Sequence, residues 1–263
     1  MIYHLQSRYA FRVHGPDAAE FLQNTLTNDI RKLTAQTPAQ YNLLLSPQGQ
    51  VLHEMFVVLQ GNGDYLIDTY EPRQADLLRR LTLFKLRANV DITPRPAIQV
   101  YAVPAGEAAP QDAIIDPRAP KLGKRIYSAD GTPAGLIHPE AGYIDDCIDM
   151  TVPVAGAIRF EKDFVHDLGL QNFNAIAWDK GCFIGQEVAA RVEHRGLAKK
   201  GLFTVTAQRI DMANPSIALQ NGMEAGEIRL SDRSGTRALA VIKKIAVEAG
   251  ESLLHAGFPL SIA

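Results

Sequence analysis

The amino-acid sequence predicts an α+β fold, with two α+β units followed by a small C-terminal antiparallel β-barrel. In the first hundred residues the order strand, helix, strands, helix, strand is typical of a split βαβ, ferredoxin-like unit. A stretch rich in Ala, Pro and Gly, residues 104–120, separates this unit from a second set of shorter elements. From residue 201 onward, short β-rich runs alternate with Gly and Asn turns, which is typical of a small barrel.

The first unit is predicted from periodicity and turn residues. Residues 3–13 form a strand, and Gly15-Pro16-Asp17 then begins a helix, because Pro suits the first turn and Asp suits the positive end of the helix dipole. The other expected elements are a strand at 41–45 that ends at the turn Ser46-Pro47-Gln48-Gly49, a hairpin of strands 51–59 and 65–70, a helix from Pro72 with Leu77, Leu78, Leu81, Phe84 and Leu86 on its core side, and strands at 90–92 and 98–103.

The second unit and the barrel are predicted in the same way. Strands are expected at 125–128, 135–137 and 143–148, and helices at 153–164 and 184–193. The barrel strands are expected at 202–206, 227–230, 238–242 and 259–262. We therefore expect three domains, 1–103, 104–200 and 201–263, in which the second can exchange segments with the first.

Composition excludes several classes of function. Hydrophobic residues make up 46% and charged residues 21%, which is typical of a globular protein, and a net charge of −2 argues against a nucleic-acid or anionic-membrane binder. The two cysteines form neither a disulfide framework nor a zinc motif, so no metal site is expected. The N-terminus resembles neither a signal nor a transit peptide, and no apolar run reaches 18 residues. We therefore expect a cytoplasmic protein with reduced thiols and no membrane partner.

The most informative stretch is 179–187, which places Cys182 between two glycines. Glycine serves where the backbone needs positive φ or close approach. A cysteine beside Lys180 and ahead of a helix start is where a thiolate is favoured. The alternative is that Cys182 is a small buried hydrophobe in a tight turn. Cys147 has no comparable setting.

The segment Lys180-Gly181-Cys182-Phe183-Ile184-Gly185-Gln186-Glu187, continued by Ala190-Arg191 and His194-Arg195-Gly196, resembles a family signature. It is the Lys-Gly-Cys-Tyr/Phe-x-Gly-Gln-Glu motif of YgfZ-type folate-binding proteins of iron–sulfur cluster maintenance. These are relatives of the glycine-cleavage T protein, an aminomethyltransferase. Three weaker segments, 15–29, 46–52 and 116–125, are similar to family segments in the same order.

The resemblance implies that the three modules surround a central channel that binds tetrahydrofolate or a derivative non-covalently. It also implies an accessory role in assembling or repairing iron–sulfur clusters, with client or assembly proteins as partners. The alternative is a folate-dependent one-carbon (aminomethyl) transferase, and a third reading is an interaction scaffold with a vestigial pocket. The transferases carry an Asn-Ala-x-Asn element, whereas Asp68-Thr69-Tyr70-Glu71 stands here without either asparagine, which counts against aminomethyl transfer.

Cys182 is the predicted functional thiol, with three open roles. It can be a nucleophile, which would need a base; a cluster ligand, which would need thiolates from a partner; or a redox thiol, which would need exposure and a lowered pKa. The motif residues expected near the folate are Lys180, Gly181, Gly185, Gln186, Glu187 and Arg191.

A pterin needs a carboxylate at its amidine-like edge, and its glutamyl tail needs cations. Glu161, beside Phe160, is the expected carboxylate, with Asp145 and Asp146 as alternatives. The expected cationic group contains Arg191, His194, Arg195, Lys199 and Lys200, which can bind the folate tail or an acidic partner, or form a solvated helix face. Glu187 at a helix start can also be purely structural.

Overall fold

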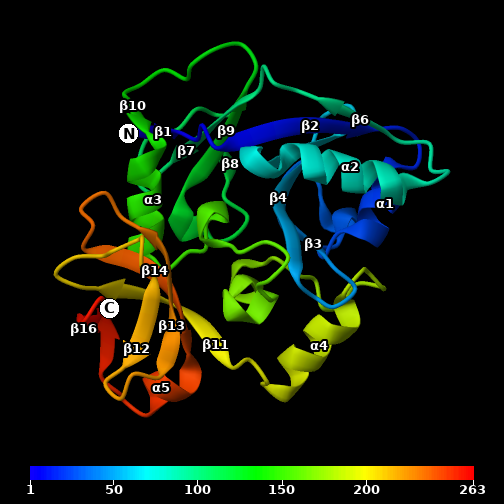
Figure 1. Cartoon of the computed structure of the whole chain (residues 1–263). Helices are drawn as coiled ribbons and strands as arrows, with labels where there is room; N and C mark the ends of the chain where they lie inside the picture. The colour runs from blue at the N-terminus through cyan, green and yellow to red at the C-terminus, as the bar shows by residue number, and fades with distance from the viewer. The chain divides into compact units, whose positions relative to one another are not determined.

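The computed structural model describes residues 1–263, which form two compact units. The first unit contains residues 1–140 and 171–188, and the second contains 141–170 and 189–263. Each unit is therefore built from segments that are distant in the sequence. Figure 1 colours the chain by residue number, so the first unit contains both blue-to-green chain and the yellow-green segment of residues 171–188.

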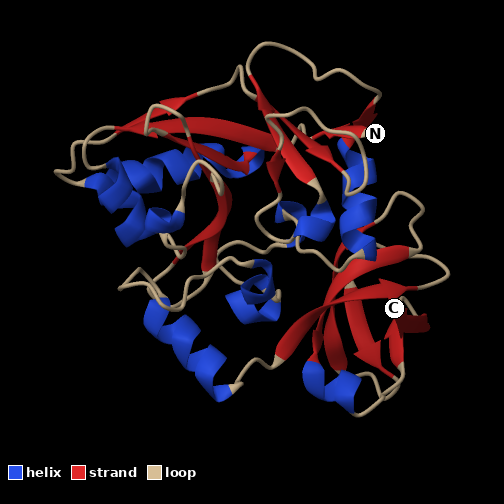
Figure 2. Ribbon diagram, turned by 180° about the vertical axis from the view of Figure 1, so that it is seen from behind, coloured by secondary structure: helices blue, strands red, loops and turns tan.

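Sheet I of the first unit is antiparallel and carries both long helices of that unit on one face (Figure 2). Helix α1 (Ala18–Thr25) and helix α2 (Gln74–Lys85) bury their apolar stripes against the sheet, as the helical periodicity predicts. The hairpin predicted at 51–59 and 65–70 is confirmed. In spatial order, the strands of sheet I are β3 (Ala39–Leu45), β4 (Val51–Leu59), β5 (Tyr65–Tyr70), β2 (Arg8–His14) and β6 (Asp91–Pro94).

The end of α2 differs from the prediction. Leu77 and Leu81 are buried, but Phe84 is 37% exposed and Leu86 is 85% exposed. The helix ends at Lys85, and Leu86 takes φ 45, so its side chain leaves the helical stripe that faces the core.

Sheet II packs on the other face of sheet I, where Ala10, Val58 and Leu66 contact Ile114 and Tyr127. The stretch predicted as one strand, 3–13, is two strands that enter different sheets, because the chain bends between them. The domain boundaries at 103 and 200 stay predictions. In spatial order, the strands of sheet II are β10 (Ile137–Pro139), β1 (Ile2–His4), β7 (Gln99–Val103), β9 (Lys124–Ser128) and β8 (Ile114–Ile115).

The second unit contains the predicted barrel, which is closed and antiparallel. Its core contains alternating inward residues such as Val205, Ile217, Ile228 and Ala240. Helix α5 (Lys244–Glu248) follows β14 at one end of the barrel (Figure 1). Around the barrel the strands are β11 (Lys200–Thr206), β14 (Arg237–Lys243), β13 (Glu224–Ser231), β12 (Ser216–Leu219), β15 (Leu253–His255) and β16 (Phe258–Ile262).

Two predicted elements of the middle region are wrong. The strand predicted at 143–148 is part of helix α3 (Glu140–Asp149), which buries Cys147 and Ile148. The helix predicted at 153–164 is a loop with the short 3₁₀ turn η4 (Ala155–Ala157), because the Asp163 carboxylate accepts the Arg159 N–H at 2.7 Å. Helix α4 (Gln186–Arg195) is confirmed. The other 3₁₀ turns are η1 (Ile30–Lys32), η2 (Glu71–Arg73), η3 (Pro120–Leu122), η5 (Val165–Asp167) and η6 (Leu170–Phe173).

Candidate functional site: the Cys182 turn and its supports

Cys182 lies in an exposed turn that leads into α4. Its thiol is free and exposed, whereas the free thiol of Cys147 is buried in α3. The next residue, Phe183, is buried, so the chain is fixed on the carboxyl side of the thiol. The prediction that Cys182 is a small buried hydrophobe is therefore wrong, and an accessible thiol remains.

Lys180 fixes the chain on the amino side of the thiol. Its Nζ donates to the carbonyl oxygens of Gln23 at 2.6 Å, Leu26 at 2.6 Å and Asn28 at 2.9 Å. These carbonyls lie at or just beyond the C-terminal end of α1, where helix carbonyls lack partners. An ammonium has three donors, and all three are used. Burial lowers the pKa of Lys180 to about 8.

Gly185 allows the turn before α4 to pack against the turn that follows β3. It takes φ +81, and a Cβ there would collide with the Ser46 carbonyl oxygen and lie 2.8 Å from the Leu45 Cβ. On the facing turn, a Cβ at Gly49 would lie 3.1 Å from the Val188 side chain. Gly181 differs, because a Cβ there would meet nothing within 4 Å.

The segment before Lys180 is held by two further motif segments. Thr27 Oγ1 donates to the Ala175 carbonyl at 2.6 Å, and Asn28 Nδ2 donates to the Asn174 carbonyl at 2.7 Å. Asn174 Nδ2 in turn donates to the Pro117 carbonyl at 3.1 Å. The four segments that the sequence resemblance picked out separately therefore converge on one support beneath the Cys182 turn.

A small pocket of 330 Å³ opens beside this support. The only tryptophan of the chain, Trp178, lines it, as do Lys32 and Asp179, which form an ion pair at 2.7 Å. Sequence reasoning missed Trp178 and Asn174, although both lie just before the motif. The residues that line this pocket are Asn28, Lys32, Asn174, Ile176, Ala177, Trp178 and Asp179.

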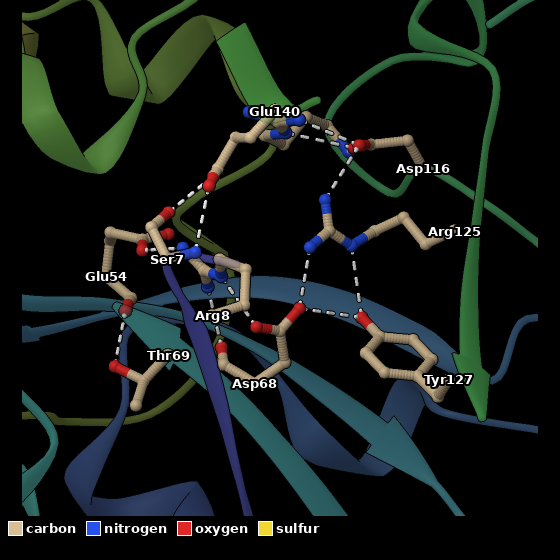
Figure 3. Close-up of polar contacts among 10 residues, drawn as sticks. Ser7, Arg8, Glu54, Asp68, Thr69, Asp116, Arg125, Tyr127 and Glu140 are labelled. Carbon is tan, nitrogen blue, oxygen red and sulfur yellow. Dashed lines mark hydrogen bonds and ion pairs between the residues drawn. The ribbon is translucent and has the colours of Figure 1, made fainter. Parts of the chain in front are cut away.

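A cluster of buried charges lies between the two sheets of the first unit (Figure 3). Arg125 occupies its centre and donates from Nη2 to the Asp68 carboxylate at 2.7 Å, while Nε of Arg8 donates to the other Asp68 oxygen at 2.6 Å. The Tyr127 hydroxyl also donates to Asp68, at 3.1 Å. We call this set the buried ion cluster; its charged members are Arg8, Glu54, Asp68, Asp116, Arg118 and Arg125.

The buried ion cluster is balanced and closely paired. Arg118 binds Asp116 through two hydrogen bonds of 2.8 and 3.0 Å. The Arg125 guanidinium lies 3.8 Å from the centre of the Phe56 ring, a cation–π contact. Burial alone would raise the pKa of Asp68, but the charges of Arg8 and Arg125 outweigh it and lower that pKa. The Arg118 and Arg125 charges likewise outweigh burial at Asp116 and lower the pKa of that carboxyl.

The remaining predicted site residues fall in two places. Gln186 is the first residue of α4, and Glu187 and Arg191, four residues apart, share a face of that helix. Glu161 lies in the second unit, exposed in a turn at φ 68. Of the alternative pterin carboxylates, Asp145 is engaged by Arg233 in an ion pair of 2.5 Å.

The cationic group formed by the last turns of α4 and the residues after it is exposed, and the one acid in this stretch, Glu193, pairs elsewhere. The Glu193 carboxylate accepts a hydrogen bond from His166 Nε2 at 2.9 Å within the second unit. Arg191, His194 and Arg195 therefore present cationic or titratable side chains on the outer surface of α4.

No three side chains of the types His, Cys, Asp and Glu gather in a way that could hold a metal ion. No helix has both the length and the apolar character needed to cross a membrane.

The fold is that of the glycine-cleavage T protein. The structure matches the aminomethyltransferase T of the glycine cleavage system from Bartonella henselae with a TM-score of 0.76 at 14% identity, over 99% of this chain and 84% of that one. At this identity the likeness shows the fold alone. It is the α+β fold with a C-terminal barrel that the sequence predicts.

The sequence relatives are iron–sulfur cluster assembly factors of the IBA57 type. The mitochondrial factor IBA57 of Homo sapiens is 30% identical over 241 residues, which is 77% of this chain. Its counterpart in Mus musculus is 28% identical over 239 residues. The chain spans 65% of the length of each relative. No family model matches the sequence. These homologues and the T-protein fold confirm the resemblance drawn from the Cys182 segment.

The predicted cytoplasmic location is wrong, because the homologues are named mitochondrial proteins. The prediction used composition and the lack of a leader-like N-terminus. Globular proteins of different compartments share this overall composition, so composition does not decide the location.

Proposed function

We propose that this chain is a folate-binding accessory protein that supports the assembly or repair of iron–sulfur clusters in client enzymes. The homology to IBA57 factors carries the proposal, because those relatives are named as iron–sulfur cluster assembly factors. The T-protein fold supports it by supplying the framework of a folate-related protein family. The exposed Cys182, in a turn fixed on both sides, supplies the chemical group.

Cys182 would act on or with a partner. A single cysteine thiolate satisfies only one coordination position of an iron–sulfur cluster, and the clusters in proteins need several. Since the structure contains no group of three metal-binding side chains, a cluster at Cys182 would need its other ligands from a client or assembly protein. The hydrogen bonds of Lys180 and the packing at Gly185 would hold the Cys182 thiol at a fixed position for that partner.

The chemistry of the exposed candidates fits the two polar ends of tetrahydrofolate. The Glu161 carboxylate suits the amidine-like edge of the pterin, and the Arg191 guanidinium suits a glutamyl carboxylate of the tail. Lys180 does not fit, because its three donors are already used by backbone carbonyls. We therefore assign Lys180 and Gly185 to the support of the turn, and keep Gln186, Glu187, Arg191 and Glu161 as folate candidates.

Aminomethyl transfer receives no support from the residues that replace the transferase element. Asp68, the acid of that stretch, is fully buried, and Arg8, Arg125 and Tyr127 bind both of its oxygens. Its pKa is lowered, so it is a poor proton acceptor at neutral pH. An assay for methylenetetrahydrofolate formation from aminomethyl donors tests this alternative, and robust turnover would overturn our ranking.

Isothermal titration calorimetry with tetrahydrofolate tests the folate part of the proposal. We expect saturable binding that Glu161→Gln and Arg191→Met each weaken by about ten- to a hundredfold, since each removes one charge-assisted contact worth roughly 1.5–3 kcal/mol. Lys244→Met, a surface change in the barrel unit, serves as the control and should bind as the parent chain does. If the parent chain shows no saturable heat with tetrahydrofolate, the folate part of the proposal fails.

A further inference from the structure

A larger cavity, of 660 Å³, lies in the first unit between two loops. Residues 35–39 form one wall and residues 111–115 form the other, with Pro117 and Lys124 completing it. Its volume lies within the range of about 300–1,000 Å³ that is usual for ligand sites. The Pro117 carbonyl accepts from Asn174 Nδ2, so the cavity borders the support of the Cys182 turn.

The wall at β8 is an unpaired strand edge. Strand β8 pairs only with β9, and Ile115 faces Lys124. The Asp116 N–H donates to the Gly123 carbonyl at 2.9 Å, which makes that position a hydrogen-bonded one. Because hydrogen-bonded and non-hydrogen-bonded positions alternate in an antiparallel pair, the N–H and C=O of Ile115 point away from β9. They have no partner in the protein, and the Ile115 residue is 57% exposed.

The opposite wall has the same property at the start of β3. The Leu59 N–H donates to the Pro38 carbonyl at 2.7 Å, so the next position, Ala39, directs its backbone groups away from β4. Further along β3 this outer edge is covered, because Thr27 bonds both backbone groups of Leu43. This cover does not extend back along β3 to its first residue, Ala39. The cavity therefore has unpaired backbone donors and acceptors on both sides.

We propose that this cavity binds an extended peptide segment of a partner protein, which adds to the β8 edge at Ile115. An unpaired strand edge can pair with another strand. In such complexes the backbone hydrogen bonds between the two strands supply affinity, and pockets that accept every second side chain of the added strand supply specificity. The wall residues Pro38, Ala113 and Ile114 offer such apolar surface. The two charged wall residues, Asp112 and Lys124, are of opposite sign, so the complement is a segment without net charge. This inference does not rest on the proposed folate or cluster function.

The test uses a defined probe, the peptide acetyl-Thr-Val-Thr-Val-Thr-amide, with two-dimensional amide NMR of the full chain. We expect saturable shifts centred on the amides of Ile115 and Ala39. The same peptide with N-methylvaline at its fourth position, which lacks one N–H but keeps the side chains, should bind at least tenfold more weakly. Equal binding of the two peptides would overturn strand addition, as would shifts confined to other strand edges or no saturation by about 1 mM.

Two variants test the same edge from the side of the protein. Ile115→Pro removes an N–H that the β8–β9 ladder does not use, so the sheet should persist while peptide binding falls at least tenfold. Ile115→Val keeps the backbone and should bind like the parent chain. Circular dichroism and the melting temperature show whether Ile115→Pro has folded; the N-methylated peptide decides the question if it has not. Undiminished binding by a folded Ile115→Pro chain would contradict the proposal.

Discussion

Replacing Lys180 by Met tests whether the Cys182 turn is held by a buried ammonium. Met keeps most of the apolar stem but removes all three donors, so the carbonyls of Gln23, Leu26 and Asn28 lose their partner. Lys180 is 5% exposed, so water replaces the ammonium poorly. The variant should therefore lose stability and also loosen the turn.

The magnitude follows from two opposing terms. Hydrogen bonds to a charged donor are worth about 1.5–3 kcal/mol each, so three give roughly 5–9 kcal/mol. Burial opposes this, because the pKa of Lys180 falls from 10.5 to about 8, a difference worth about 3 kcal/mol that Met does not incur. We expect Lys180→Met to lower the free energy of unfolding by about 2–6 kcal/mol.

Urea denaturation followed by circular dichroism measures this change. Lys32→Met is the matched control, because Lys32 pairs with Asp179 at an exposed site and should contribute at most about 1 kcal/mol. Reaction of Cys182 with a thiol reagent should also quicken in Lys180→Met, since the turn is freed. A loss below about 0.5 kcal/mol would refute the support that we assign to Lys180.

Three further predictions concern the same framework. Gly185→Ala should cost about 2–3 kcal/mol, because a Cβ at φ +81 meets the Ser46 carbonyl, whereas Gly181→Ala should stay within about 0.5 kcal/mol; equal melting temperatures would contradict this. Asp68→Asn should cost about 3–5 kcal/mol in urea denaturation, since Arg8 and Arg125 would stay buried without their shared carboxylate, and a neutral result would refute a structural role for the buried ion cluster. Burial lowers the pKa of His53 from 6.5 to about 4, so the unfolded chain binds the proton first and stability should fall by about 3 kcal/mol as pH drops through that window. His53→Gln should flatten that part of the stability profile, and an unchanged slope would count against it.

Local patterns in the sequence were sufficient for the hairpin and the barrel. The strands β4 and β5 and four of the barrel strands have β-rich runs bounded by Gly and Asn, which act within a few residues. The run 143–148 was ambiguous, because a short apolar segment suits either a strand or a helix. The break between β1 and β2 could not be predicted, since it depends on pairing with β10, β7 and β5, far along the chain.

The candidate site shows the same division. The helix after Cys182 was predictable from its spacing of apolar residues, whereas the sequence left open whether Cys182 itself is exposed or buried. The partners of Lys180 were not predictable, because they lie more than 150 positions earlier in the chain. The buried ion cluster was also missed. Arg8, Asp68 and Arg125 look like surface positions of half-buried strands, and only the stacking of the two sheets brings Arg125 onto the other two.

The most direct measurement of the central claim is the activity of an iron–sulfur enzyme in cells that lack their own IBA57-type factor and express this chain. We predict that Cys182→Ala abolishes the recovery of that activity, while Cys147→Ala, which removes the buried thiol, preserves it when both proteins accumulate to equal levels. Full recovery with Cys182→Ala would contradict the account.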